Sequence, residues 1–279
     1  MKRVAIQGFH GSFHEQAACG FYKEHEGIVP EIVECATFEG LFRALSEGRA
    51  DAAVMAVENT TSGGLLPNFD LLRRNGNRVN GEIYLHIHQN LMALPGQKLE
   101  DIREVHTHYM AINQTREFFE TECPWIRMVE SEDTAKSAAD VAEHRLEGVG
   151  AVASSMAAER FGLEILKENI ETYKQNYTRF LVLDDSLAAP GKKVNKASVC
   201  FTLLHAPGSL AKILAILSFY DMNLTRIQSL PIPGMKWQYF FYADITFESY
   251  ERYTQAISAI RPLMDCLDIM GEYTSGLKL

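Results

Sequence analysis

The stretch Phe38-Glu39-Gly40-Leu41-Phe42-Arg43-Ala44-Leu45, followed by Gly48 and then by Ala52-Ala53-Val54-Met55-Ala56-Val57, decides the fold class of this chain. The apolar residues at 38, 41, 42 and 45 share one face of a helix, which Gly48 ends. The apolar run over 52–57 predicts a strand. A helix that leads into such a strand indicates an α/β fold.

The same alternation extends to about residue 185. Residues 4–6 predict a strand, and Ser12-Phe13-His14-Glu15 has the Ser-x-x-Glu form of a helix-capping box. Further strands are predicted near 83–94, 103–106 and 149–153. Further helices are predicted near 66–74, 110–120, 134–147 and 154–161.

Residues 184–196 have the composition of a linker, with charge, Pro and Gly but no periodicity. We therefore predict domains over 1–185 and 196–279. In the second domain we expect a helix with Pro207 in its first turn. The predicted order there is strand 197–204, helix 207–220, strand 223–231, strand 237–247, helix 250–264 and strand 267–274. This βαββαβ order is typical of a ferredoxin-like fold.

Composition excludes several classes of protein. The 279 residues are 47% hydrophobic and 23% charged, as in an ordinary globular protein. The net charge of −9 argues against nucleic acid or an anionic membrane as a partner. Five scattered cysteines without a C-x-x-C pair fit reduced thiols. The chain starts without an apolar segment of signal-peptide length and has no apolar run of about 18 residues, so we expect a cytoplasmic protein.

Two predicted strand-to-helix turns are candidate binding sites. Glu58-Asn59-Thr60-Thr61-Ser62-Gly63-Gly64 follows the strand at 52–57 and offers hydroxyls and backbone N–H groups to a carboxylate or phosphate. A plain helix-capping loop is the alternative. Gly8-Phe9-His10-Gly11-Ser12 is a second turn of this kind, but it lacks the dinucleotide fingerprint.

Metal and covalent chemistry are not indicated. His86-x-His88 and His106-x-His108 have no further ligands at a recognisable spacing, so we expect no metal site. No Gly-x-Ser-x-Gly elbow or activated cysteine is apparent. We expect a protein that binds a small anion and uses no cofactor.

The segment Asn176-Tyr177-Thr178-Arg179-Phe180 places a hydroxyl, a cation and an aromatic ring at the start of an apolar run. In a strand, Thr178 and Phe180 would share one face and Arg179 would lie on the other. An ordinary strand start with a solvated arginine would explain this triplet alone.

Several such motifs in order give the chain a resemblance to the prephenate dehydratase family over its whole length. They are Gly8-x-x-Gly11-Ser12-Phe13 with Gln16-Ala17-Ala18, Val57-Glu58-Asn59-Thr60-Thr61-Ser62-Gly63, Thr107-His108 with Gln114, Asp133-Thr134-Ala135, Ala151-Val152-Ala153-Ser154, Asn176-x-Thr178-Arg179-Phe180, and a C-terminal module similar to the ACT domain. The resemblance implies two α/β lobes, like a type II periplasmic binding protein, with the active site in the cleft between them.

The resemblance also implies the reaction, in which prephenate loses its ring carboxylate and its C4 hydroxide to give phenylpyruvate. Thr178 would donate a hydrogen bond to the leaving oxygen, with water or Glu58 as proton source. Arg179 would hold the pyruvyl carboxylate, because a cation on the departing ring carboxylate would stabilise the ground state. Phe180 would cover the ring; core packing is the alternative for this residue.

The remaining residues that the resemblance assigns fall into two groups. The substrate would be bound by Ser12, Asn59, Thr60, Thr61, Ser62, Gly63, Thr107, Gln114, Thr134 and Asn176. Phenylalanine, as effector, would bind the ACT-like module at Pro207, Gly208, Ser209, Leu210, Ala211, Asn223, Leu224, Gln228, Ser229 and Pro231. Because Gln228 and Leu230 replace a glutamate and an arginine of the family pattern, we expect weaker inhibition.

Alternatives stay open. Arogenate, which carries an amino group in place of the side-chain keto oxygen, could be the preferred substrate. The chain could instead be a non-catalytic binding module, or an amino-acid sensor acting on a partner protein. In each case we expect a homodimer or a dimer of dimers, because a lone βαββαβ unit leaves strand edges open.

Overall fold

The computed structural model describes residues 1–187 and 194–279 and divides the chain into two compact units. The central part of the predicted linker, residues 188–193, lies outside the described residues. Unit 1 comprises Met1–Leu65, Ile83–Phe180 and Lys278–Leu279, and unit 2 comprises Leu66–Glu82 and Leu181–Leu277. Among the described residues, no helix is long and apolar enough to cross a membrane.

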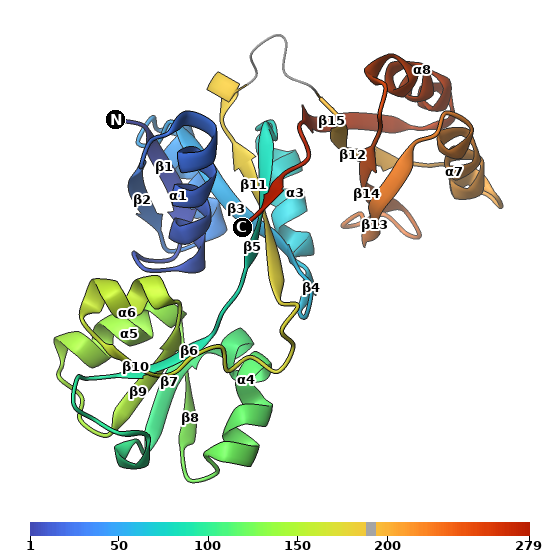
Figure 1. Ribbon diagram of the computed structural model, residues 1–279. Coiled ribbons are helices and arrows are strands. Elements are labelled where there is room, and N and C mark those ends of the chain that lie inside the picture. Colours follow the sequence, from blue (N-terminus) through green and yellow to red (C-terminus); the bar gives the residue numbers. More distant parts are fainter. Residues whose placement is uncertain (188–193) are drawn as a thin grey trace. The chain divides into compact units, whose positions relative to one another are not determined.

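The first sheet has the order β16-β5-β11-β3-β1-β2, with the short β4 paired to β3. Helix α1 connects β1 to β2 (Figure 1), and α2 connects β2 to β3. The bounds are β1 Arg3–Gln7, α1 Phe13–Glu26, β2 Glu31–Cys35, α2 Phe38–Ser46, β3 Ala52–Asn59, β4 Gly63–Gly64, β5 Gly81–His86, β11 Tyr177–Leu183 and β16 Leu277–Lys278. Val54 and Met55 are both fully buried, so β3 is covered on both faces. Unit boundaries fall within β5, β11 and β16, and one falls directly after Leu65.

The second sheet, which lies wholly in unit 1, has the order β10-β6-β9-β7-β8 and helices on both faces. Leu91 packs in one apolar cluster with Phe119 of α4, and Met92 packs in another with Ala138 of α5. Successive strand residues thus cover opposite faces. The bounds are β6 Asn90–Ala93, β7 Glu104–His108, α4 Tyr109–Glu122, β8 Arg127–Ser131, α5 Thr134–Glu143, β9 Val149–Ala153, α6 Ser155–Phe161 and β10 Glu164–Lys167, with a 3₁₀ turn at Leu99–Asp101. The predicted two-lobed α/β fold is confirmed.

The strand predicted over 83–94 is wrong in one respect, because it is two strands in different sheets. The chain leaves the first sheet after His86 and enters the second at Asn90. Between them, Ile87 N donates to Asn176 O at 2.7 Å, and Gln89 N donates to the Glu171 carboxylate at 2.9 Å. The returning segment 168–176 therefore takes the place of a sheet neighbour, and the two crossings lie side by side.

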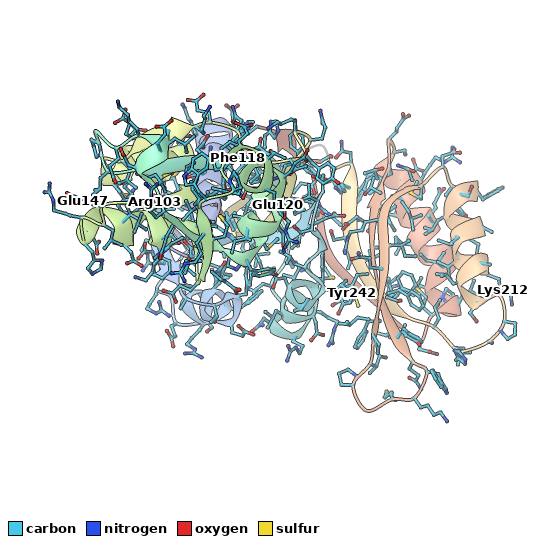
Figure 2. The ribbon with its side chains drawn as sticks, turned by 90° about the horizontal axis from the view of Figure 1, so that it is seen from below. Arg103, Phe118, Glu120, Glu147, Lys212 and Tyr242 are labelled. Carbon is cyan, nitrogen blue, oxygen red and sulfur yellow. The ribbon has the colours of Figure 1, made fainter. Side chains whose placement is uncertain are left out.

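The C-terminal part of unit 2 is an antiparallel sheet of order β13-β14-β12-β15 with α7 and α8 packed on it (Figure 1). The predicted ferredoxin-like βαββαβ arrangement is confirmed. Lys212, on the outer face of α7, points away from the sheet (Figure 2). The bounds are β12 Lys196–Thr202, α7 Ser209–Phe219, β13 Asn223–Pro231, β14 Tyr239–Thr246, α8 Tyr250–Ile260 and β15 Cys266–Tyr273, with 3₁₀ turns at Asp185–Leu187 and Arg261–Leu263.

The start of α7 and the ends of α5 and α8 differ from the predictions for reasons that the structure shows. Helix α7 begins at Ser209 and has Gly208, at φ +80°, as its N-cap, so Pro207 precedes the helix. Helix α5 ends at Glu143 rather than 147, where the His144 N–H bonds back to Asp140 O. Helix α8 ends at Ile260, because Pro262 favours the 3₁₀ turn that follows.

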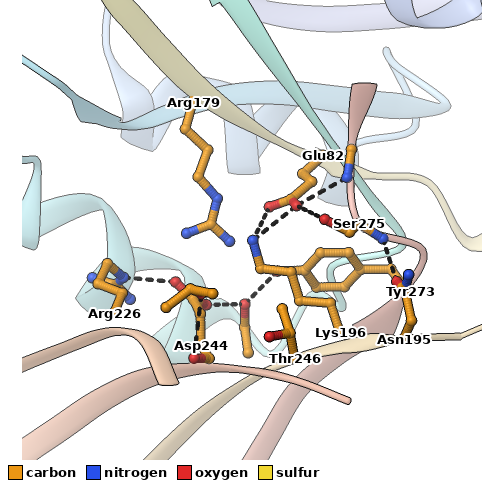
Figure 3. A network of polar contacts seen from close by, with 12 residues as sticks. Glu82, Arg179, Asn195, Lys196, Arg226, Asp244, Thr246, Tyr273 and Ser275 are labelled. Atoms are coloured by element: carbon orange, nitrogen blue, oxygen red, sulfur yellow. Dashed lines mark hydrogen bonds and ion pairs between the residues drawn. The ribbon is translucent and has the colours of Figure 1, made fainter. Parts of the chain in front are cut away.

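Unit 2 also contains α3 (Leu66–Asn75), which sequence placed with the first domain. The Phe69 ring lies 5.8 Å from that of Tyr242, and the Arg226 guanidinium stacks 3.6 Å over Phe69. Figure 3 shows the accompanying charged network, in which Lys196 Nζ contacts both Glu82 oxygens at 2.8 and 2.9 Å. These buried charges are paired, so segment 66–82 and the C-terminal module form one body.

Candidate active site

The loop after β3 is folded around the side chain of Asn59. Asn59 Oδ1 accepts hydrogen bonds from Thr61 N and Ser62 N, both at 2.9 Å, and from the Thr61 hydroxyl at 2.6 Å. Such side-chain-to-backbone bonds are what favours Asn in turns. Since backbone N–H groups can face only an acceptor, they also fix which atom of the Asn59 amide is the oxygen.

The amide nitrogen of Asn59 therefore points to the start of β11. Asn59 Nδ2 donates to Asn176 Oδ1 at 2.8 Å and to Thr178 Oγ1 at 2.9 Å. A hydroxyl has one donor and two acceptor positions. Because Thr178 is the acceptor here, its own O–H hydrogen is left to donate elsewhere. Among the described residues, no hydrogen bond donated by Thr178 is found.

Gln114 lies on α4, in the lobe built on the second sheet, and its side chain links that lobe to the loop after β3. Gln114 Nε2 donates to Thr61 Oγ1 at 3.1 Å. Gln114 Oε1 accepts from Asn176 Nδ2 at 3.1 Å and from Gln89 Nε2 at 3.0 Å. A continuous hydrogen-bonded chain thus runs from the crossing segment through Gln114 and Thr61 to Asn59 and Thr178.

A pocket of about 90 Å³ lies along this network. It contains four of the predicted substrate-binding residues together with Glu171, Asn113 and Tyr173. The four are Thr61, Ser62, Gln114 and Asn176. Sequence reasoning missed Gln89 and Glu171, which lie in the two crossing segments and carry no periodic or motif signal of their own.

Arg179 and Phe180 take different environments. The Arg179 side chain is 3% exposed, and its Nη1 lies 3.9 Å from Glu58 Oε2. Phe180 is buried and meets the His14 ring edge to face at 5.0 Å. Desolvation lowers the pKa of His14 to about 3, so this ring is neutral, and its Nε2 accepts a hydrogen bond from Ala56 N at 3.3 Å. The Phe180 ring thus packs inside the lobe built on the first sheet, which is the core-packing alternative given for this residue.

Five of the predicted substrate-binding residues lie outside the Asn59 network. The Ser12 hydroxyl caps α1 by accepting from Glu15 N at 3.3 Å, and Thr107 is fully buried with its hydroxyl donating to Val152 O at 2.7 Å. Thr60 joins its loop to β11 through Tyr177 N at 2.9 Å. Thr134 is the first residue of α5, and Gly63 lies in β4.

The glycines of the Gly8–Ser12 turn allow a close approach between the lobes. Gly8 has φ +100°, and a Cβ there would lie 2.9 Å from Asp133 Oδ2. Gly11 has φ +86°, and a Cβ there would lie 3.1 Å from the Cα of Ala157. Ser154 completes this contact, its hydroxyl donating to Gly11 O at 2.6 Å. Burial raises the pKa of Asp133, so this carboxyl holds its proton more readily than usual.

The histidines of the two predicted pairs have other residues as neighbours, although the His86 and His88 rings lie 4.0 Å apart. His86 stacks on Tyr177 at 4.5 Å between ring centroids, and His106 Nε2 lies 3.5 Å from a Glu104 oxygen. Within residues 1–187 and 194–279, no group of three or more His, Cys, Asp or Glu side chains could hold a metal ion.

Comparison with known proteins gives consistent results. The family model described as prephenate dehydratase matches residues 4–187. The chain is 32% identical over 276 residues to the bifunctional chorismate mutase/prephenate dehydratase of Aquifex aeolicus (strain VF5), covering 99% of this chain and 74% of that protein. It is 33% identical over 282 residues to the chloroplastic arogenate dehydratase/prephenate dehydratase 2 of Arabidopsis thaliana, covering 97% and 72%.

Two solved structures are similar over nearly the whole chain. One is a prephenate dehydratase from Arthrobacter aurescens in complex with L-Phe, with a TM-score of 0.83, 26% identity and coverage of 98% of this chain and 89% of that one. The other is GqqA, described as a novel type of quorum quenching acylases, with a TM-score of 0.86, 29% identity and coverage of 98% of both chains.

Proposed function

Because the chain belongs to the prephenate dehydratase family, we propose that it converts prephenate to phenylpyruvate in the biosynthesis of phenylalanine. The C–C bond to the ring carboxylate breaks and releases carbon dioxide. Its electron pair completes the aromatic ring as the C4–O bond breaks, and the hydroxide leaves as water after taking up one proton. The observation that carries this proposal is the Thr178 hydroxyl, which accepts from Asn59 and keeps its hydrogen for the leaving oxygen.

Hydroxide is a poor leaving group, so stabilising its departure is the main demand on the site. Thr178 donates to that oxygen, and the proton comes from water or from Glu58. Asn59 holds Thr178 as an acceptor and so sets the direction of its hydrogen. This arrangement stabilises charge that develops only in the transition state, which raises kcat.

Binding is assigned to the rest of the network. In this proposal Arg179 holds the pyruvyl carboxylate. Its contact with Glu58, 3.9 Å away, is replaced by the contact with the substrate. Ser62 and Gln114 supply neutral donors along the pocket, whereas the Thr61 hydroxyl already donates to Asn59 Oδ1. Neutral donors suit the ring carboxylate, because a paired cation there would stabilise the ground state.

For the C-terminal module we propose an ACT-type regulatory role with phenylalanine as effector, and pairing of two chains. Pro207, Gly208 and Ala211 are exposed and available to a ligand or a second copy. Strand β13 forms one edge of the sheet, and Leu204 and Trp237 are 69% and 61% exposed. Asn223, in contrast, lies at the opposite end of α7 from Gly208.

The proposal also covers the cellular compartment of the protein and a second candidate activity. A cytosolic location is supported by the cysteines, which are all free in the structure. The likeness to GqqA favours one second candidate, hydrolysis of an acyl amide. The two reactions give different products and are readily separated.

The test is a spectrophotometric assay of phenylpyruvate formed from prephenate, with and without phenylalanine. A parallel reaction offers an acylated amine and measures the free amine released. We expect phenylpyruvate, with a rate that phenylalanine lowers. Release of amine without phenylpyruvate would replace the proposal by the acylase.

A further inference from the structure

Glu171 is a buried carboxylate in the pocket to which the proposed chemistry gives no role. Its side chain is 1% exposed. It lies in the segment 168–176 through which the chain returns to the first lobe, and it lines the same pocket as Thr61, Gln114 and Asn176. A buried charge at a binding pocket is costly unless it is paired, so it calls for a ligand or a structural partner.

The two oxygens of this carboxylate differ in their partners. Oε2 accepts a hydrogen bond from Gln89 N at 2.9 Å. Oε1 accepts no hydrogen bond from any described residue, and the His88 Nδ1 lies 3.4 Å away. Gln89 Oε1 likewise has no donor among the described residues, while Gln89 Nε2 donates to Gln114. Two buried acceptors without donors therefore belong to residues that are hydrogen-bonded to each other.

A surplus acceptor on a residue that lines the pocket, such as Glu171 Oε1, discriminates between the two substrates that the family uses. Prephenate and arogenate share the ring and both carboxylates, and they differ in one side-chain group. The keto oxygen of prephenate can only accept a hydrogen bond, whereas the ammonium of arogenate is positive and carries three donors. An oxygen that lacks a donor attracts the ammonium and repels the keto oxygen.

We infer that Glu171, whose other oxygen is held by Gln89 N, recognises the side-chain ammonium of arogenate and shifts the selectivity of the site toward that substrate. The inference rests on the proposed function, since both substrates undergo the same loss of carbon dioxide and water. Arogenate then yields phenylalanine directly. Selectivity of this kind comes from a charge that favours one substrate and disfavours the other.

The substitution Glu171→Gln tests this role with little change in shape. It keeps an oxygen to accept from Gln89 N and removes the negative charge. Glu168→Gln is the matched control, because Glu168 lies three residues away in the same segment, is exposed and carries the same charge. A purely structural role for Glu171 would alter both substrates alike and leave their ratio unchanged.

The measurement is the initial-rate kcat/KM of wild type and both variants for arogenate and for prephenate, with phenylalanine and phenylpyruvate quantified as the two products. We expect wild type to convert both substrates. In Glu171→Gln the ratio of arogenate to prephenate kcat/KM should fall at least about tenfold, while Glu168→Gln keeps the wild-type ratio.

An unchanged ratio in Glu171→Gln overturns the inference. So does a wild type that converts prephenate but has no measurable activity on arogenate, an outcome that needs no folded variant. A wild type that converts neither substrate refutes the proposed function itself, so the two failures are distinguishable.

Discussion

The substitution Asn59→Asp changes one atom of the candidate site and reverses the hydrogen bond to Thr178. The retained oxygen still accepts from the backbone N–H groups of Thr61 and Ser62. The new oxygen takes the position of Nδ2, 2.9 Å from Thr178 Oγ1 and 2.8 Å from Asn176 Oδ1. Thr178 can turn its hydrogen toward this oxygen, so its hydrogen is withdrawn from the leaving hydroxide.

The size of the effect follows from the loss of one positioned donor. Removing such a donor costs about 10²- to 10³-fold in kcat, or about 3–4 kcal/mol in the barrier. We therefore expect kcat to fall at least about 10²-fold with little change in KM. Asn176 cannot relieve the contact by rotating its amide, because it would then present its oxygen to Gln114 Oε1. The free energy of unfolding should fall by about 1–3 kcal/mol from this oxygen–oxygen contact.

The assay is steady-state conversion of prephenate to phenylpyruvate by the folded variant, checked by thermal unfolding. Asn113→Asp is the control for charge, since Asn113 lines the same pocket and has no hydrogen bond to Thr178 in the structure. Its kcat should exceed that of Asn59→Asp at least about tenfold. Equal kcat in Asn59→Asp and wild type would refute the role of the Thr178 hydrogen.

Two further predictions concern binding and control. Arg179→Lys should chiefly raise KM for prephenate, because lysine lacks the planar two-pronged contact with a carboxylate; a collapse of kcat at unchanged KM would instead make Arg179 a partner that positions Glu58. Phe69→Leu removes the ring under Arg226 and should cost about 1–2 kcal/mol of stability. Since α3 directly follows the Asn59 loop in the chain, Phe69→Leu should also weaken inhibition by phenylalanine while kcat is retained. The control is Phe21→Leu, which shortens another buried ring. Equal inhibition of the two variants would show that Phe69 does not link the phenylalanine site to the Asn59 loop.

The regular fold could largely be predicted from the sequence, because its signals are local. Apolar periodicity identified α2, β3 and the βαββαβ order of the C-terminal module. Five strands were missed. β2, β8, β10 and β16 each lie at an edge of a sheet, and β4 is a two-residue strand that pairs with β3. Edge strands carry charged residues and are partly exposed, as in Glu31–Cys35, so they lack a continuous apolar run.

Part of the candidate site could also be predicted, because several of its residues lie in local sequence motifs. Asn59, Thr61, Gln114, Asn176 and Thr178 belong to motifs and do meet in one hydrogen-bonded network. The motifs could not show which hydroxyl groups are used in hydrogen bonds within the protein and which are left for a ligand. The Thr107 and Thr60 hydroxyls are such cases, because their hydrogens go to backbone carbonyls of distant segments.

Residues of the crossing segments could not be found from the sequence. Gln89 and Glu171 are 82 positions apart, and their hydrogen bond exists because two irregular segments run side by side. The grouping of α3 with the second unit has a similar cause. Its amphipathic pattern shows which face is buried but not which element covers it.

The role of Thr178 is tested most directly by kcat for prephenate in wild type, Thr178→Ala and Thr178→Ser. We expect Thr178→Ala to lower kcat about 10²-fold or more with little change in KM, because the donor to the leaving oxygen is lost. Thr178→Ser keeps a hydroxyl within reach of Asn59 and should retain much of the rate. If folded Thr178→Ala forms phenylpyruvate as fast as wild type, Thr178 does not donate to the leaving oxygen.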